Sequence, residues 1–463
     1  MLLRPAKAAI GSNMNEFQIH VRRDNHDQPD EPQGIMIRTD SVVLTDLLRG
    51  ADDQPDDHLK APPANLAFWL VDHWWRLRWE CMPPHECITP EWQQAHELSS
   101  VGGGYAWPRV TIWGDGQRVG LISKADPPDT VGPVRFQSNA LVFIDGGTYE
   151  AAVDKFLAET ADADQGFGSD REALRSIINA LSAERADPDV AQWRRFEAIA
   201  GFDVDEAPDS LTDSLEGLIS RYSAPDIEEA VYAAPGEHAS QVLNNIVQGV
   251  RESSFAKVNF TQAVRICSRE LDSRDEEPWI LAETASSMLR SQISAGSRPL
   301  RNRNLSELVE AETSVLHSRS SGTYKNAPYG VRLRTDDSAR DHVFLRNHKG
   351  FDRRFEIARC LGDAVWTNNS PLGPISRSGT ARQKFQRAFA ASLLCPYDAL
   401  IDFLATDSPT DGRLFDAARY FHVSERVVRS VLVNKKIIQR YRLHLPVTDL
   451  RNEKSIEELA EAA

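Results

Sequence analysis

The sequence predicts an α+β protein with more than one domain, and three observations favour that class. The chain has 463 residues, more than one ordinary hydrophobic core organises, so two or three domains are expected. Its N-terminal part mixes strand-like and helix-like segments, and its middle part is acidic with helical periodicity. Its C-terminal part combines several helices with one short pair of strand-like runs. We therefore expect an N-terminal mixed α/β domain, a helical connector, and a C-terminal helical domain with a small sheet.

Composition and charge narrow the classes of function. Hydrophobic residues make up 41% and charged residues 26% of the chain, as in ordinary globular proteins. The net charge of −15 disfavours a general nucleic-acid binder, although a local basic face is compatible with it. The longest apolar runs, such as 65–75, are too short to span a bilayer, so no membrane partner is expected. The N-terminus lacks the apolar core of a signal peptide.

Cysteine usage points to a reducing compartment. The five cysteines are scattered and predict no disulfide framework: Cys81, Cys87, Cys267, Cys360 and Cys395. We therefore expect a cytoplasmic protein.

The N-terminal third begins with a segment that has little to bury. Residues 1–33 are polar, charged and contain proline, so we expect a flexible N-terminus. Residues 34–160 are expected to form the mixed α/β domain, whose role the sequence does not reveal. Its elements, in order, are predicted to be a strand and short helix (34–50), a buried helix (66–80), a hairpin around Gly114-Asp115-Gly116 (107–123), and a strand, Gly-Gly turn and helix (140–159).

The remaining two thirds of the chain, residues 161–463, divide into three segments of different composition. Residues 161–275 are acidic and helical with repeated turn signals, which predicts a connector. Residues 276–445 are expected to form the C-terminal domain, and 446–463 a polar tail. The elements predicted in that domain are an amphipathic helix from about 279, a β pair (329–347), the helix RRFEIARCLGDAVW (353–366), the helix FQRAFAASLLCP (385–396), and two short helices around a tight turn (414–438).

Three motifs in this domain carry a family resemblance. Their order within 279–438 resembles the ImmA/IrrE family of zinc metallopeptidases. That family's motifs read roughly R-F-T-L-A-H-E-L-G-H, E-x-E-A-N-x-F-A-A-x-L-L-M-P and A-x-x-F-x-V-S-x-x-x-V-x-x-x-L. The residues that match here are Arg354, Phe355, Ala358, Leu361 and Gly362, then Phe389, Ala390, Ala391, Leu393, Leu394 and Pro396, then Ala418, Phe421, Val423, Ser424, Val428 and Leu432.

The resemblance implies a metallopeptidase fold, but its catalytic positions are substituted. In H-E-x-x-H, two histidines four residues apart hold zinc and the glutamate activates the bound water. Those positions are Arg359, Cys360 and Asp363 here, and the family's third ligand falls at Gln383 or Phe385. An arginine cannot ligate a cation. We expect no catalytic residues, no zinc and no other cofactor, with Phe355, Ala358, Leu361, Phe389, Ala390, Leu393 and Leu394 buried between the two motif helices.

Two alternatives to an inactive site remain open. Cys360, Asp363, Glu356 and Cys395 could hold a relocated zinc ion, or Cys360 could act as a thiol nucleophile. The plainer interpretation is that the cysteines are small buried residues and that Asp363 pairs with a nearby cation. A second motif, AHELSS (95–100), begins like H-E-x-x-H but has Ser100 in place of the second histidine, so we expect no metal there.

The end of the domain resembles a helix-turn-helix. Ser424 is suited to cap the second helix, and His422 falls at a turn position that commonly needs a positive φ. Between 412 and 444, eight Lys and Arg residues stand against Asp416 and Glu425, a local charge of +6. Arg426, Arg429, Lys435 and Lys436 are therefore candidate phosphate contacts.

Three functions follow as hypotheses. The first is a catalytically inactive ImmA/IrrE-like protein that binds a protein or peptide in the groove between the motif helices. The resemblance suggests stress, mobile-element or phage-related regulation as its setting. The second is a DNA-binding regulator that uses 413–442. The third is a peptidase with a rebuilt metal or thiol site.

Overall fold

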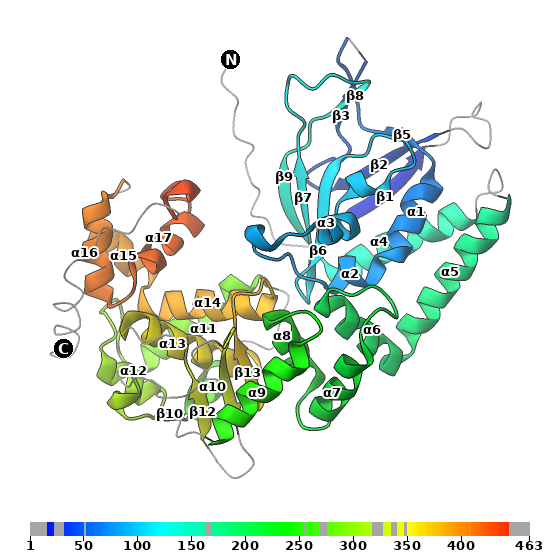
Figure 1. Ribbon diagram of the computed structural model, residues 1–463. Helices are drawn as coiled ribbons and strands as arrows, with labels where there is room; N and C mark the ends of the chain where they lie inside the picture. The colour runs from blue at the N-terminus through cyan, green and yellow to red at the C-terminus, as the bar shows by residue number, and fades with distance from the viewer. Residues whose placement is uncertain are drawn as a thin grey trace. The chain divides into compact units, whose positions relative to one another are not determined.

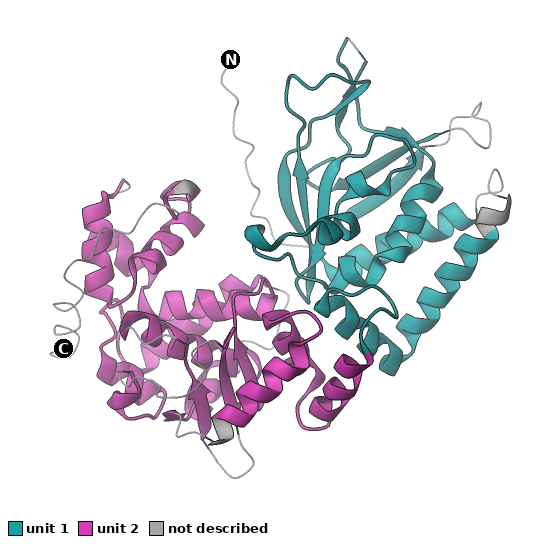
Figure 2. Ribbon diagram, viewed as in Figure 1, with its two compact units in different colours: residues 1–208 teal, residues 209–463 magenta. Residues whose placement is uncertain are grey.

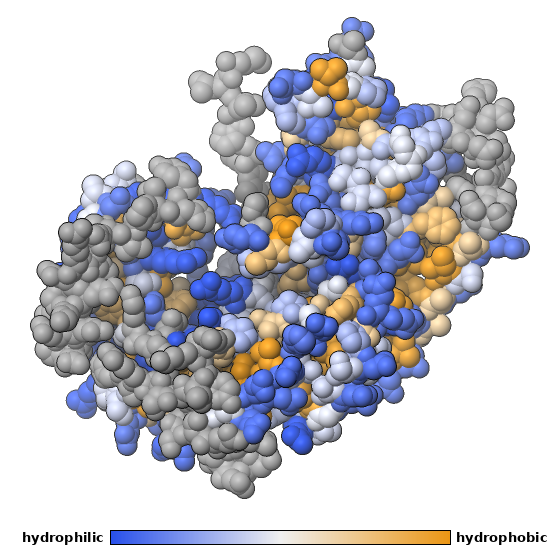
Figure 3. All heavy atoms as spheres, viewed as in Figure 1, coloured by the Kyte–Doolittle hydropathy of each residue, from blue (hydrophilic) through white to orange (hydrophobic). Residues whose placement is uncertain are grey.

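The fold is α+β, with helices packed beside small antiparallel sheets (Figure 1). The computed structural model describes residues 16–22, 32–50, 52–162, 168–252, 256–268, 276–316, 327–334, 340–346, 350–406 and 408–443. The chain divides into two compact units, Met1–Pro208 and Asp209–Ala463 (Figure 2). In the view of Figure 3, hydrophilic side chains cover much of the surface, with hydrophobic patches between them. Within the described ranges, no helix combines the length and apolarity that a membrane span requires.

The first unit contains three small sheets and six helices within its described residues. The sheets have the strand orders β1-β2-β5, β4-β3-β8 and β6-β7-β9, and every pairing is antiparallel. The strands are β1 (Phe17–Arg22), β2 (Gln33–Thr39), β3 (Leu47–Arg49), β4 (Gln54–Asp56), β5 (Leu59–Ala61), β6 (Arg109–Gly114), β7 (Arg118–Lys124), β8 (Val134–Phe136) and β9 (Ala140–Asp145). The helices are α1 (Pro63–Asp72), α2 (Trp74–Trp79), α3 (Pro90–His96), α4 (Gly146–Ala161), α5 (Gly168–Ala186) and α6 (Pro188–Ala200).

Several expectations for this unit are confirmed and others are wrong. The hairpin forms as β6 and β7, with Gly116 at φ +90° in the turn. The predicted buried helix is two helices, because the backbone leaves helical geometry at His73. The short helix expected after β2 is absent, since Leu47–Arg49 is strand β3. Gly146 and Gly147 form the first turn of α4 and not a separate turn, because the Asp145 side chain caps the helix by accepting from the Thr148 N–H.

The ends of the expected domains also differ from the structure. The segment 1–33 contains strand β1, whose residues pair along their length with β2 from Phe17–Thr39 to Arg22–Gly34. The expected connector is divided between the units, because α5 and α6 pack against α1 and α2, whereas β10 joins the sheet of the second unit. The polar tail 446–463 lies outside the described residues.

The second unit surrounds one four-stranded antiparallel sheet of order β10-β12-β11-β13. Its strands are β10 (Ala256–Val258), β11 (Gly330–Arg334), β12 (Asp341–Phe344) and β13 (Leu372–Ile375). Its helices are α7 (Asp209–Ile219), α8 (Ala224–Ala233), α9 (Ala239–Glu252), α10 (Thr261–Cys267), α11 (Pro278–Gln292), α12 (Asn302–Leu308), α13 (Gly350–Trp366), α14 (Ala381–Leu394), α15 (Tyr397–Leu404), α16 (Asp411–Phe421) and α17 (Glu425–Asn434). The predicted β pair is therefore β11 and β12, and both predicted motif helices form.

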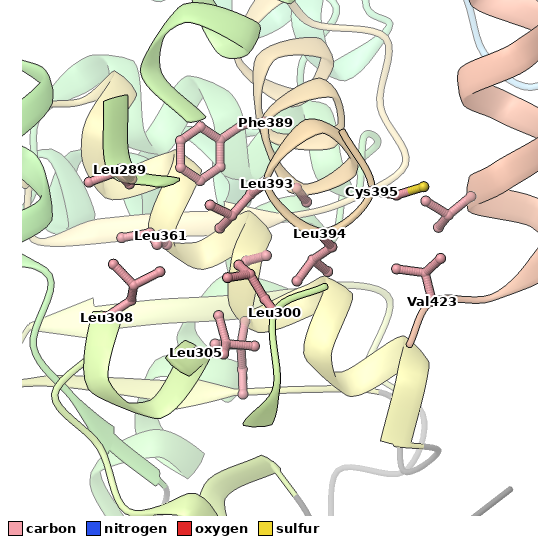
Figure 4. Close-up of a cluster of buried hydrophobic side chains, with 14 of the residues drawn as sticks. Leu289, Leu300, Leu305, Leu308, Leu361, Phe389, Leu393, Leu394, Cys395 and Val423 are labelled. Atoms are coloured by element: carbon pink, nitrogen blue, oxygen red, sulfur yellow. The ribbon is translucent and has the colours of Figure 1, made fainter. Parts of the chain in front are cut away.

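The core of this unit lies where α11, α13 and α14 meet (Figure 4). Six of the seven residues expected between the motif helices are fully buried: Ala358, Leu361, Phe389, Ala390, Leu393 and Leu394. Phe355 is only partly buried and packs at the edge of the cluster. Close helix approach depends on Gly362, because a Cβ there would lie 2.8 Å from Cδ1 of Phe389.

The helix pair α16 and α17 forms around the predicted tight turn. His422 adopts φ +53°, as its position predicts. Ser424 is the N-cap residue of α17, but its side chain makes no capping hydrogen bond.

We predict that Gly362→Ala lowers the free energy of unfolding by about 1–3 kcal/mol, because Phe389 must leave its packed position. Urea unfolding of the full chain measures the change. Gly217→Ala on α7 is the matched control. A Cβ at Gly217 meets no atom within 4 Å, so this variant should gain about 0.5–1 kcal/mol of helix propensity. Equal stability of Gly362→Ala and the wild type would contradict the close α13–α14 packing.

Candidate functional site

The candidate site is a buried polar network where α13 and α14 face β11 and β13. Helical spacing places Arg359 and Asp363 one turn apart on α13. On α14, Gln383 and Gln386 are buried in the first turns, and Thr380 caps the helix by accepting from the Gln383 N–H. Asp363, Gln383 and Gln386 are 0% exposed, so their polar atoms depend on partners within the protein.

Asp363 is the centre of the network. Its Oδ2 accepts from Nη2 of Arg332 at 2.9 Å, and its Oδ1 accepts from Nε of Arg382 at 2.7 Å. Arg332 comes from β11 and Arg382 from α14, so one carboxylate joins three elements. Burial alone would raise the pKa of Asp363, but Arg382 and Arg332 outweigh it and hold the pKa below its usual range.

The network extends from Asp363 to α8. Arg382 Nη1 donates to Asp226 at 2.9 Å, and the Thr380 hydroxyl donates to Glu229 at 2.8 Å. Burial raises the pKa of Glu229, although Arg382 and Thr380 oppose the shift. The network around Asp363 is thus joined to a fourth element, α8, through the Arg382–Asp226 and Thr380–Glu229 contacts.

Arg359 is a buried cation held by neutral acceptors. Its Nη2 donates to the Ser376 carbonyl at 2.6 Å and to Oε1 of Gln383 at 2.5 Å. Its Nε is buried without a hydrogen-bond partner. Burial, together with the nearby positive charge of Arg387, lowers the pKa of Arg359 to about 9. Gln386 connects this arginine to the centre, because its Oε1 accepts from Arg359 and its Nε2 donates to Asp363 at 2.7 Å.

Three of the four positions singled out by the family resemblance therefore come together. Arg359 contacts Gln383 directly and reaches Asp363 through Gln386. Two guanidinium groups on Asp363, and a third at Arg359, put positive charge where the resemblance places a metal ion. These residues do not fit zinc, since guanidinium groups repel a divalent cation and amides are poor replacements for imidazole.

The proposed replacement metal and thiol sites are not assembled. Cys360 is 0% exposed in the hydrophobic core, and burial raises the pKa of its thiol. Glu356 is buried near Gly330 of β11, whereas Cys395 is buried as the C-cap residue of α14 (Figure 4). Burial raises the pKa of Cys395 to about 12. Across the described ranges, the one set of three Cys, His, Asp or Glu ligand atoms within 4.8 Å of one another is Asp56, Asp57 and His58.

The basic candidates in the helix-turn-helix-like segment have different surroundings. Arg429 is 1% exposed and is bonded to Glu425 at 2.5 Å, so its guanidinium is committed to the fold and cannot reach a phosphate. Lys435 pairs with Glu283 of α11 at 2.8 Å. Arg426 and Lys436 are exposed. Of the four candidates, Arg429 is therefore buried, whereas Arg426, Lys435 and Lys436 are exposed, with Lys435 in a surface ion pair.

The histidine of AHELSS is a core residue. His96 is 0% exposed, with Nδ1 2.6 Å from the Ile112 carbonyl and Nε2 2.9 Å from Glu80. Glu80 in turn accepts from Nε of Arg76 at 2.7 Å. Both ring nitrogens are used, so His96 is not available as a ligand.

A hollow on the surface lies at α10 and α11, not between the motif helices. Leu361 and Phe389 fill the space between α13 and α14. The hollow is shallow and open, has a volume of about 820 Å³, and is lined by Ile266, Glu283, Thr284, Ser287, Met288, Ser291 and Gln292. The opposite face of α11 packs against α14, where the Ser286 and Ser392 hydroxyls meet at 2.8 Å.

Sequence reasoning missed the partners of Asp363. Arg332, Arg382, Gln386 and Asp226 carry the network, and none was singled out. One signal was present: Arg382 and Gln386 are four residues apart on the helix that carries Gln383, so they share its face. An arginine within the short apolar strand GVRLR was a second signal of a buried partner.

Comparison with known proteins gives no match. No family model matches the chain. Neither a curated protein nor a solved structure matches it.

We predict that Asp363→Asn destabilises the folded chain by about 3–5 kcal/mol near neutral pH, because Arg332 and Arg382 lose their buried counter-charge. Chemical denaturation of the full chain measures the loss. Asp416→Asn, at an exposed position on α16, should lie within about 0.5 kcal/mol of the wild type.

A comparison of the wild type with Asp363→Asn over a range of pH tests the ionisation of Asp363. Its folded-state pKa lies below the ordinary value of 3.8, so the stabilisation is present above that value and is lost as pH falls through the folded-state pKa. The stability gap between wild type and Asp363→Asn should therefore shrink in strong acid. A gap that is unchanged with acidification would show that Asp363 carries no charge in the folded protein.

Proposed function

We propose that this chain is a catalytically inactive ImmA/IrrE-like protein that acts by binding another protein. One observation carries the proposal: a guanidinium group, a carboxylate and an amide belong to one hydrogen-bond network at Arg359, Asp363 and Gln383, the positions where the resemblance places metal-site residues. Hydrogen bonds within the network pair the Asp363 carboxylate, the Gln383 amide and Nη2 of Arg359, and leave Nε of Arg359 without a partner. The scaffold residues of the motifs and the close packing of α13 on α14 are kept.

The H-E-x-x-H positions on α13 lack the chemical groups that peptide hydrolysis needs. Zinc peptidases need a Lewis acid to polarise the carbonyl and a general base to activate water. Cys360 occupies the position of the base, and its buried thiol has a raised pKa. Arg359 and Arg382 would repel the metal ion. A rebuilt peptidase site therefore has no support from the contacts on α13.

The hollow on α11 is the surface we assign to the partner. Its one charged residue, Glu283, is already paired with Lys435, and the other lining side chains are apolar, hydroxyl or amide groups. A lining whose one charge is already paired, and which presents no free cation, favours an amphipathic helix over nucleic acid or an acidic peptide. Ile280 is 41% exposed on the same helix and adds apolar surface. Glu283 to Gln292 span about 15 Å, enough for two to three turns of such a helix.

The setting is also a proposal. None of the five cysteines forms a disulfide, which is compatible with a reducing, cytoplasmic location. By analogy with the family it resembles, the chain would act in stress, mobile-element or phage-related regulation. DNA binding has less support, because Arg429 and Lys435 are engaged in ion pairs within the protein.

We predict that the full chain supplied with zinc does not hydrolyse casein or fluorogenic peptides above background. Cys360→Ala, purified in parallel, controls for contaminating proteases and should give the same background. Turnover by the wild type that Cys360→Ala abolishes would refute the proposal.

We further predict that Ser287→Arg blocks partner binding, because a long charged side chain would occupy the exposed face of α11. Co-purification with the tagged full chain from its own cells is the measurement. Ser220→Arg, at an exposed position after α7, should retain the partner. Retention of the same partner by Ser287→Arg would exclude the α11 hollow as the docking surface.

A further inference from the structure

Two histidines of the first unit meet on the outer face of the β1-β2-β5 sheet. His20 lies on β1, and His58 directly precedes β5. Their ring centroids are 6.0 Å apart, with the planes at 77°. When two imidazole nitrogens bind one zinc ion, each at about 2.0–2.1 Å, the centroids of the two rings lie at a similar spacing. The two histidine rings would therefore need to move little to bind an ion together.

The His58 ring is oriented by a carboxylate. Its Nδ1 lies 2.5 Å from Oδ1 of Asp57, an oxygen that can accept a ring N–H. The side chain of His58 is only 9% exposed, whereas that of Asp57 is 52% exposed. A carboxylate on one nitrogen and a free lone pair on the other is the arrangement that fixes metal-binding histidines.

The second nitrogen of His58 has no assigned role in the fold. Nε2 is buried and has no hydrogen-bond partner, which is costly for a polar atom. Cδ2, the ring atom next to it, lies 3.4 Å from where a Cβ of Gly34 would stand. Leu59 of β5 pairs with Ile35 of β2, and His20 of β1 pairs with Met36. His58, one residue before Leu59, is therefore level with His20 across β2.

The neighbouring carboxylates are already in use. Asp56 Oδ2 accepts from Nη2 of Arg49 at 3.0 Å. Asp56 Oδ1 accepts from the backbone N–H groups of Asp57 and His58. The proximity of Asp56, Asp57 and His58 is therefore explained by the turn itself, and the unassigned ligand atom is Nε2.

We propose that His20 and His58 form a binding site for a divalent transition metal ion such as Zn²⁺, Cu²⁺ or Ni²⁺, with Asp57 as the positioning residue. Imidazole nitrogen suits these ions, whereas Mg²⁺ and Ca²⁺ require oxygen ligands. Two protein ligands leave the other coordination positions to water, so the site is open and exchangeable. Arg22 and Lys60 lie on the same strands and add positive charge, so the affinity is expected to be below that of a closed four-ligand site.

The test is a Zn²⁺ titration of the full chain by calorimetry and by competition with a chromophoric chelator. We expect a site with one ion per chain whose affinity falls at least about tenfold in His20→Ala, since one of two protein ligands is lost. Asp57→Asn should weaken it by about 10–100-fold through the orientation of His58. His238→Ala is the matched control, because this histidine is 74% exposed in the second unit and should leave binding unchanged.

A second readout does not depend on affinity. Cu²⁺ added to the full chain should give an electron paramagnetic resonance spectrum with imidazole nitrogen couplings that change in His20→Ala and in His58→Ala. His20 is exposed, so its replacement should leave the fold intact if His58→Ala does not fold. Absence of Zn²⁺ and Cu²⁺ binding, or wild-type binding by His20→Ala, would overturn the proposal. Loss of binding in Asp56→Asn alone would place the ion on the carboxylates and overturn it equally.

Discussion

The C-terminal unit depends on a buried carboxylate between two guanidinium groups. Asp363 is fully buried and is bonded to Arg332 of β11 and Arg382 of α14. A charge removed from water is stable only when its partners surround it, so these three side chains must be together or the unit cannot close. Helix α13, the sheet and α14 are thereby held in one relative position. The apolar side chains of Leu361 and Phe389 pack into the space between the two helices.

This network also supplies positive charge at the place where the family resemblance puts a metal ion. In a metal site the ion supplies the positive charge and much of the folding free energy. Here the positive charge is covalently attached, on Arg332, Arg359 and Arg382, and amides of Gln383 and Gln386 complete the hydrogen bonds. In the proposed relation to zinc peptidases, Arg359, Asp363 and Gln383 replace the metal ligands, which removes catalysis and preserves the scaffold.

The first unit shows the same use of buried charge in a different setting. Glu80 lies between Arg76 and His96, and its pKa, which burial would raise, is held down by these two neighbours. His58 differs, because only one of its nitrogens is satisfied. A fully satisfied histidine stabilises the core, whereas one with an unpaired nitrogen beside a second histidine has capacity for a ligand.

Local patterns in the sequence determined the elements, and long-range contacts decided the site. Apolar spacing predicts α13, α14 and the β6–β7 hairpin, because each signal lies within one continuous segment. The family resemblance also groups Arg359, Asp363 and Gln383, because they occupy the positions of its metal-site residues. Strand β1 was missed although FQIHVR alternates apolar and polar residues, because the polar composition of 1–33 as a whole masked this short segment. The partners of Asp363 lie 31 and 19 residues away, on β11 and α14. Periodicity shows which face of an element is buried but not which side chain meets it, so only the tertiary structure could assign two arginines to one carboxylate.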